Sequence, residues 1–126
     1  MTKARPLIAV VDDEQSVCVA LQRLVRSAGM DVETYSSGEE FLQAVQTHEF
    51  DCVLLDLHMP KVNGHEVLLR LTQFSTRLPA LVITGHDTPE GRGRALSAGA
   101  AAYLLKPVDG RTLLDAIATA VAIETS

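Results

Sequence analysis

Five short strand-like segments alternate with longer amphipathic segments along this chain, and this alternation limits the folds open to it. The strand-like segments begin near Leu7, Asp31, Cys52, Ala80 and Tyr103. After each of them, apolar residues recur at helical spacing. Because parallel strands need a long crossover between them, usually a helix, this pattern predicts an α/β fold with a parallel sheet. The chain has 126 residues, so we expect one domain over residues 1–126.

Turn residues and apolar periodicity place the individual elements. We expect strands at Leu7–Val11, Asp31–Tyr35, Cys52–Leu55, Ala80–Thr84 and Tyr103–Leu105. We expect helices at Glu14–Ala28, after a capping box of Ser37 and Glu40, after Gly64, after an N-cap at Thr88, and at Thr112–Ile123. The third strand is apolar throughout and should be central, whereas the partly polar second strand suits a sheet edge. Gly91 and Gly93 each cost about 1 kcal/mol relative to alanine inside a helix, so the helix after Thr88 should be the loosest.

Charge and hydropathy exclude several classes of protein. The formal net charge is -5, from 16 acidic and 11 basic residues, and the basic residues are scattered. We therefore expect no direct nucleic-acid binding by this chain. The apolar runs are too short to cross a bilayer, and acidic residues interrupt the N-terminus before a signal-peptide core develops. These features predict a cytoplasmic protein with no membrane segment.

The cysteines and histidines show no metal-binding spacing. Cys18 and Cys52 lie among apolar residues, where reduced thiols pack as small hydrophobic side chains, and a redox or disulfide role is the alternative. The four histidines lack the paired helical spacing of a zinc site, so we do not expect zinc: His48, His58, His65 and His86.

Polar residues stand where four of the five predicted strands end. In an open parallel sheet, ligands bind outside the carboxyl ends of the strands, where the strand order reverses. Five residues share that position and together form the candidate site: Asp12, Asp13, Asp56, Thr84 and Lys106.

The three carboxylates of this set predict a cation site. Neighbouring carboxylates repel one another and raise the pKa of at least one of them. Lys106 supplies one positive charge, and a hard divalent cation would supply the rest, with Mg²⁺ favoured and Mn²⁺ as the alternative. Carboxylates, a metal ion and a lysine together suit the handling of phosphoryl groups. The residues alone leave open whether the phosphate is substrate, ligand or covalent adduct.

Four motifs give the chain a resemblance to a known family. The motifs VVDDE, LLDLHMPKVNG, VITG and LLKP, in this order and spacing, resemble the receiver domain of bacterial two-component response regulators, the CheY-like domains. The resemblance covers essentially the whole chain, and DLHMP followed by Gly64 is its most specific part. VITGHDTPEG further resembles the FixJ-type subgroup, which usually carries a DNA-binding output domain. The resemblance implies a doubly wound, flavodoxin-like (βα)5 fold, with parallel strands in the order 2-1-3-4-5 and helices on both faces.

The resemblance also implies how the acidic residues act. Asp56 is the phosphoacceptor, which takes a phosphoryl group from the phosphohistidine of a sensor histidine kinase or phosphotransfer protein. Asp12, Asp13 and Asp56 bind Mg²⁺, and the main-chain carbonyl of His58 completes the protein's share of the ligands. The domain is then a signalling phosphoacceptor, which catalyses only its own phosphoryl transfer and dephosphorylation.

The same resemblance implies a switch. Lys106 and Thr84 contact the phosphate oxygens, and Tyr103 is the switch aromatic whose rotation follows Thr84. The Lys106–Pro107 peptide bond is expected to be cis, unlike most X–Pro bonds. Phosphorylation would alter the surface of the fourth helix, fifth strand and fifth helix, which then homodimerises or binds an output partner.

Three positions bear on the lifetime of the phosphoryl group. Gly85 stands where the family usually has alanine, which predicts easier access for water. The family tunes lifetime two residues after the acceptor and two residues after the threonine, at His58 and His86. A neutral His86 would orient the attacking water and a protonated one would shield the adduct, so lifetime would vary between about pH 6 and 8. The alternative is that both are solvated loop histidines.

Structural roles are the alternatives for the remaining site residues. For the three aspartates these are turn capping and stabilisation of a helix dipole, and for Lys106 a solvated strand end. For Thr84 and Tyr103 they are strand formation and core packing.

Two other functions are alternatives to the receiver domain. A small magnesium-dependent phosphatase would use Asp56 as a transient nucleophile, but such enzymes generally need a second aspartate where this chain has His58. A flavin or nucleotide binder would need a glycine-rich loop after the first strand, which is absent. The sequence leaves open the cognate kinase, the output pathway, the oligomeric state, the phosphoryl lifetime and the presence of a DNA-binding domain.

Overall fold

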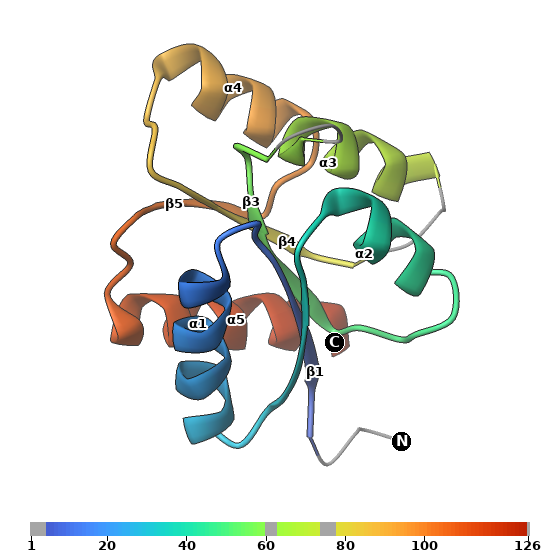
Figure 1. The fold of residues 1–126 in the computed structure, drawn as a ribbon, viewed down its shortest axis with the longest axis vertical. Coiled ribbons are helices and arrows are strands. Elements are labelled where there is room, and N and C mark those ends of the chain that lie inside the picture. The colour runs from blue at the N-terminus through green and yellow to red at the C-terminus, as the bar shows by residue number, and fades with distance from the viewer. Residues whose placement is uncertain (1–4, 60–62, 74–77, 126) are drawn as a thin grey trace.

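The computed structural model describes residues 5–59, 63–73 and 78–125, with the side chains of residues 123–125 left out (Figure 1). One sheet of five parallel strands runs in the order β2-β1-β3-β4-β5: β1 (Leu7–Val11), β2 (Asp31–Tyr35), β3 (Cys52–Asp56), β4 (Ala80–Thr84) and β5 (Ala102–Leu105). The helices alternate with the strands: α1 (Gln15–Ser27), α2 (Gly38–Ala44), α3 (Gly64–Gln73), α4 (Pro89–Ser97) and α5 (Gly110–Thr125). This is the predicted flavodoxin-like topology.

The helices divide between the two faces of the sheet (Figure 1). Val10 and Leu54 point into the core that the strands share with α1 and α5. Val11 and Leu55, one residue further along, point into the core shared with α2, α3 and α4. All five residues of β3 are buried, as predicted for a central strand. Only Val32 of β2 is buried, which confirms β2 as an edge strand.

The local signals at the helix ends act as predicted. The Ser37 hydroxyl accepts a hydrogen bond from the Glu40 N–H at 3.2 Å, and the Thr88 hydroxyl accepts one from the Gly91 N–H at 2.9 Å. Gly29 ends α1 with a φ of 85°. Only Ala95 of α4 is buried, and the prediction that α4 is the loosest helix stays a prediction. No helix within the described ranges is long and apolar enough to cross a membrane.

The predicted boundaries of several elements shift by one or two residues. α5 begins at Gly110 instead of Thr112, because the carboxylate of Asp109 accepts a hydrogen bond from the Thr112 N–H at 3.0 Å. β3 extends one residue further, to Asp56, and β5 begins one residue earlier, at Ala102. α3 includes Gly64 instead of following it.

The register of the sheet brings the functional strand ends together. Val11 of β1 is level with Leu55 of β3, and Thr84 of β4 is level with Leu105 of β5. Because all five strands are parallel, the residues that end or follow them meet at one edge of the sheet.

Candidate functional site

Three carboxylates converge at this edge, as predicted. Asp12 and Asp13 follow β1, and Asp56 is the last residue of the adjacent β3. One carboxylate oxygen from each lies within 4.8 Å of the others. Asp12 and Asp56 are buried, at 2% and 5% exposure, while Asp13 is exposed. The site therefore has two buried acids and an open side formed by the third.

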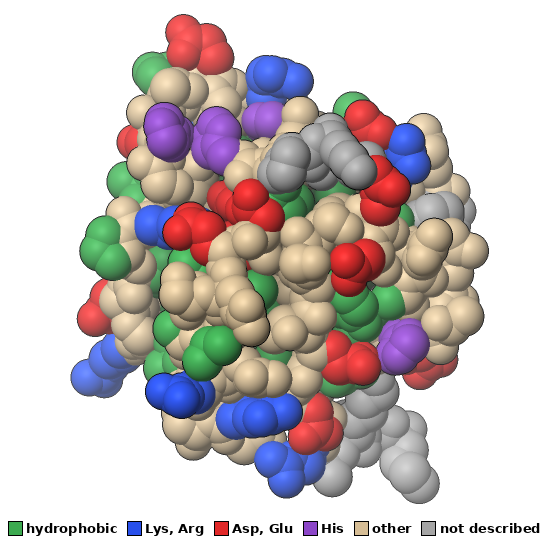
Figure 2. Space-filling view, in the orientation of Figure 1, with side chains coloured by type: hydrophobic (Ala, Val, Ile, Leu, Met, Phe, Trp, Pro, Cys, Tyr) green, Lys and Arg blue, Asp and Glu red, His purple; other side chains and the backbone are tan. Residues whose placement is uncertain are grey.

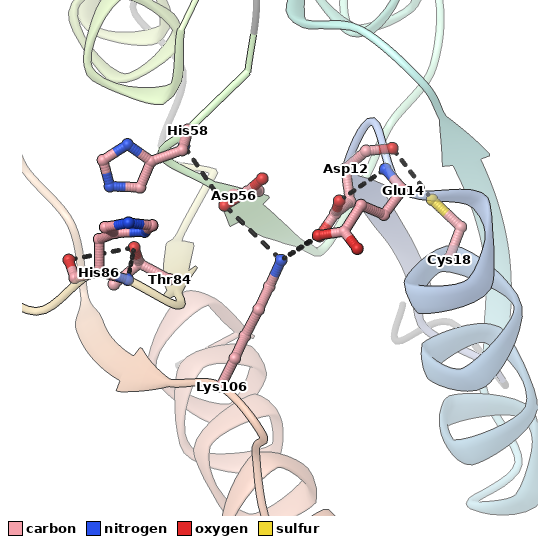
Figure 3. A network of polar contacts seen from close by, with 8 residues as sticks. All are labelled: Asp12, Glu14, Cys18, Asp56, His58, Thr84, His86 and Lys106. Carbon is pink, nitrogen blue, oxygen red and sulfur yellow. Dashed lines mark hydrogen bonds and ion pairs between the residues drawn. The ribbon is translucent and has the colours of Figure 1, made fainter.

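Lys106 projects from the end of β5 into this acidic cluster (Figure 3). Its Nζ lies 2.9 Å from Asp12 Oδ2, 3.7 Å from Glu14 Oε1 and 3.8 Å from Asp56 Oδ1. Its main-chain N–H donates to the Thr84 carbonyl at 2.8 Å, and the following Lys106–Pro107 bond is cis, as expected. The ammonium group thus contacts Asp12 more closely than Asp56.

Burial and charge shift the ionisation of the site. Burial raises the pKa of Asp56, and the negative charge of Asp12 raises it further, while Lys106 and the His58 N–H oppose the rise. Burial alone would lower the pKa of Lys106, but its hydrogen bond to Asp12 and the nearby carboxylates raise it overall. The charge of Asp12 thus acts in the predicted direction on the pKa of Asp56, although burial has the larger effect.

Main-chain contacts fix the orientation of the two buried acids. Asp12 Oδ1 accepts from the Glu14 N–H at 2.9 Å, and Asp56 Oδ1 accepts from the His58 N–H at 3.3 Å. A Cβ at Gly64 would lie 2.6 Å from the Asp56 carbonyl oxygen, so the start of α3 approaches the acceptor strand as only glycine allows. Helix α3 therefore supports the position of Asp56 directly.

Thr84 and Tyr103 meet at the peptide of His86. Thr84 is fully buried, accepts from the His86 N–H at 3.1 Å and donates to the His86 carbonyl at 3.3 Å. The Tyr103 hydroxyl donates to the same carbonyl at 3.4 Å. Burial and the nearby Asp87 carboxylate raise the pKa of Tyr103, which keeps its hydroxyl available as a donor. The guanidinium carbon of Arg92 lies 5.5 Å from the centre of the Tyr103 ring.

The imidazoles of His58 and His86 are in contact. Their ring centres are 4.9 Å apart and their planes are inclined by 58°. Gly85, between Thr84 and His86, faces open space, since a Cβ there would meet nothing closer than Lys106 Cδ at 4.0 Å. This agrees with the predicted access for water.

Sequence reasoning missed three of these contacts. Glu14 was visible as the third acid of VVDDE, yet its ion pair with Lys106 depends on how α1 begins. The contact of Arg92 with Tyr103 and the contact between His58 and His86 both join separate loops or elements. For the histidines, the available signal was their shared offset of two residues from site residues on adjacent strands.

The donor atoms fit a hard divalent cation. Three carboxylate groups within reach of one another, one of them solvent-accessible, match the oxygen ligands and retained waters that Mg²⁺ prefers. Lys106 leaves part of the negative charge uncompensated, because its one ammonium pairs with three acidic side chains, those of Asp12, Glu14 and Asp56, and Asp13 adds a further carboxylate to the cluster. This acidic cluster is of the type that binds Mg²⁺ in receiver domains.

Fold and site together define a class of protein, the doubly wound α/β domain with an acidic cation pocket, a lysine and a threonine at its carboxyl edge. The response regulator receiver domain family matches residues 8–118. The chain belongs to this family, and it is a receiver domain of a two-component system, a phosphoacceptor signalling module rather than a classical enzyme.

Individual relatives agree with this assignment. The chain is 35% identical over 121 residues to the response regulator protein TodT of Pseudomonas putida. The matched region covers 96% of this chain and 53% of TodT. It is 40% identical to a response regulator receiver protein of Burkholderia phymatum, with a TM-score of 0.84. That match covers 94% of this chain and 96% of the Burkholderia protein. The chemotaxis protein CheY4 of Vibrio cholerae is 29% identical, with a TM-score of 0.87 and coverage of 93% and 99%. The chain thus spans about half the length of TodT.

Proposed function

We propose that Asp56 is the phosphoacceptor of this receiver domain. An Asp56 carboxylate oxygen attacks the phosphorus of a phosphohistidine, a P–O bond forms as the P–N bond breaks, and the departing imidazole keeps the electron pair. The observation that carries this role is that Asp56 combines a raised pKa with an oxygen 3.8 Å from Lys106 and within 4.8 Å of the other two carboxylates. Asp12 is bound to Lys106 at 2.9 Å, and Asp13 is exposed. Both are therefore less suited than Asp56 to accept the phosphoryl group.

Asp12, Asp13 and Asp56, with the main-chain carbonyl of His58, would hold Mg²⁺, with Mn²⁺ as the alternative ion. When bound, the ion supplies positive charge that neutralises the phosphoryl oxygens. Lys106, 2.9 Å from Asp12 and 3.8 Å from Asp56, supplies a second positive charge and holds Asp12 in place.

Thr84 and Tyr103 carry the signal away from the site. The Thr84 hydroxyl gives up its bond to the His86 carbonyl at 3.3 Å and donates to a phosphoryl oxygen instead. Tyr103 then turns inward and alters the surface of α4, β5 and α5. Leu96 and Leu105 leave exposed apolar area on these elements, each at 46% exposure, which supports a role in homodimerisation or output binding.

A receiver domain implies a cognate histidine kinase as phosphodonor. We propose in addition a cytoplasmic location, as is typical of receiver domains. The chain is either a standalone regulator or the receiver part of a FixJ-type DNA-binding regulator, and the length of TodT, about twice the part that this chain matches, favours the second. His58 and His86 would tune how long the phosphoryl group survives. The position of His58, two residues after Asp56, argues against the rival phosphatase, as does the family match.

Treatment with acetyl phosphate tests the acceptor role. In the presence of Mg²⁺ the intact mass of the chain should increase by one phosphoryl group, and chelation of the metal should prevent the increase. Asp56→Asn should remain unmodified while Glu40→Gln, a matched change of an exposed acid on α2, is modified like the wild type. Equal modification of Asp56→Asn would show that another residue is the acceptor.

A further inference from the structure

His58 and His86 form a pair of exposed imidazoles in contact with each other. They lie on separate loops, after β3 and β4, with ring centres 4.9 Å apart. Among the described residues, the hydrogen bonds of His58 and His86 involve their main-chain atoms and not their ring nitrogens. On the face shown in Figure 2, histidine side chains lie next to each other beside a group of acidic side chains.

We propose that His58 and His86 bind one borderline divalent transition-metal ion of the Zn²⁺ type, through one ring nitrogen each. With ring centres 4.9 Å apart, rotation of these exposed side chains brings one nitrogen of each ring within reach of one ion, at the usual Zn–N distance of about 2.0–2.1 Å. Two protein ligands leave the remaining positions to water, which makes this an exchangeable surface site, unlike a structural zinc centre with four protein ligands. The spacing of the histidines in the sequence does not predict this pair, because the two loops come together only in the folded protein.

The chemistry of the donors separates this site from the acidic cluster. Asp12, Asp13 and Asp56 offer carboxylate oxygens, which suit Mg²⁺, whereas imidazole nitrogens suit Zn²⁺, Ni²⁺ and Cu²⁺. Among the described residues, the grouped metal ligands at the acidic site include no histidine. Figure 3 shows the two imidazoles on the side of Asp56 that faces away from Asp12. Both ions therefore have room on the same edge of the sheet.

One consequence rests on the proposed function of Asp56. A metal ion on the two rings occupies the imidazole lone pair that would otherwise orient an attacking water. An ion bound to His86, the residue after Gly85, would also lie close to the open space at Gly85 and so restrict the approach of water from that side. The bound ion should therefore lengthen the lifetime of the phosphoryl group.

Calorimetric titration of the unphosphorylated chain with Zn²⁺, in excess Mg²⁺ to fill the acidic cluster, tests the binding. Wild type should bind one Zn²⁺, and His58→Gln and His86→Gln should each weaken binding at least about ten-fold. His48→Gln removes an exposed imidazole elsewhere, so it should bind Zn²⁺ as wild type does. Zn²⁺ should also shift the imidazole NMR signals of His58 and His86 and not those of His48.

Unchanged affinity in both glutamine variants, or equal loss in His48→Gln, would overturn the site. The lifetime is measured separately, as loss of the phosphoryl group with and without Zn²⁺ after removal of donor. Zn²⁺ should slow that loss in wild type and have no effect in His58→Gln. Because the titration uses unphosphorylated protein, a failure of Asp56 to accept phosphate would leave the binding result unaffected, so the two failures are distinguishable.

Discussion

The hydroxyl groups of Thr84 and Tyr103 donate to the same main-chain oxygen, that of His86, at 3.3 and 3.4 Å. A movement of the Thr84 hydroxyl toward a phosphoryl group therefore releases an acceptor that Tyr103 shares. Arg92 contacts the ring of Tyr103 from α4, so the same tyrosine joins the site to that helix. This arrangement gives the proposed switch a physical connection from β4 to the α4 surface.

Replacing Thr84 with valine should break this connection. Thr84→Val keeps the shape of the side chain but leaves the His86 N–H without its acceptor, which should lower the free energy of unfolding by about 1 kcal/mol in urea denaturation. The NMR signals of the Tyr103 ring should then stop responding to acetyl phosphate. Thr84→Ser keeps the hydroxyl and should retain the response; a full response in Thr84→Val would contradict the connection.

Asp56 should make the protein less stable at neutral pH when no divalent cation is present. Its pKa is raised in the folded state by burial and by Asp12, so the folded chain holds this proton more tightly than the unfolded chain. Stability from this proton is present at acidic pH and is lost as the pH rises through the folded-state pKa. Asp56→Asn should therefore be more stable than wild type at pH 7 in EDTA.

The measurement is the difference in unfolding free energy between Asp56→Asn and wild type as a function of pH. The extra stability of Asp56→Asn should shrink as the pH is lowered through the folded-state pKa of Asp56, because wild type then carries a neutral acid too. Titratable groups elsewhere cancel in the comparison of the two proteins. A difference that stays constant across the acidic range would mean that Asp56 titrates normally.

Asp109 should stabilise the start of α5 through its charge. Hydrogen bonds from the Thr112 N–H and hydroxyl, both at 3.0 Å, lower the pKa of Asp109. Because the pKa is lowered, this stabilisation is present above the unfolded-state pKa and is lost as the pH falls through the folded-state value. Asp109→Ala should unfold at lower urea concentration than wild type at pH 7, with a smaller difference in acid. Asp115→Ala, an exposed acid within α5, is the control and should change little.

Two glycines should respond in opposite ways to alanine. A Cβ at Gly64 would lie 2.6 Å from the Asp56 carbonyl oxygen and 2.7 Å from Leu57 Cα, so Gly64→Ala should cost about 1–3 kcal/mol of unfolding free energy. Gly93 in α4 has no atom within 4 Å of its Cβ position, so Gly93→Ala should add about 0.5–1 kcal/mol. Thermal or urea unfolding of both variants measures this. Equal changes in unfolding free energy would show that α3 can move away from Asp56 at little cost.

Local signals in the sequence were sufficient to predict the elements and a parallel sheet, while the strand order came from the family resemblance. The apolar run of β3, the Ser37 and Thr88 caps and Gly29 after α1 all act where the pattern places them. The convergence of Asp12, Asp13, Asp56 and Lys106 also followed, since strand ends of a parallel sheet share one edge.

What the sequence could not predict depends on tertiary geometry. The preference of Lys106 for Asp12 over Asp56 is a matter of about an ångström, 2.9 against 3.8 Å. The contact between His58 and His86 requires two loops to meet, and neither loop has a periodic sequence pattern that predicts it. Helix α5 began two residues early because the Asp109 carboxylate caps it.

Locating the phosphoryl group on the chain is the most direct test of Asp56 as the phosphoacceptor. After reaction with acetyl phosphate and Mg²⁺, hydroxylamine converts an aspartyl phosphate into a hydroxamate whose position peptide mass spectrometry can determine. If Asp56 is the acceptor, the hydroxamate forms at Asp56, and the carboxyl groups of Asp12 and Asp13 remain unmodified. A hydroxamate at either of those residues, with Asp56 unmodified, would contradict this role.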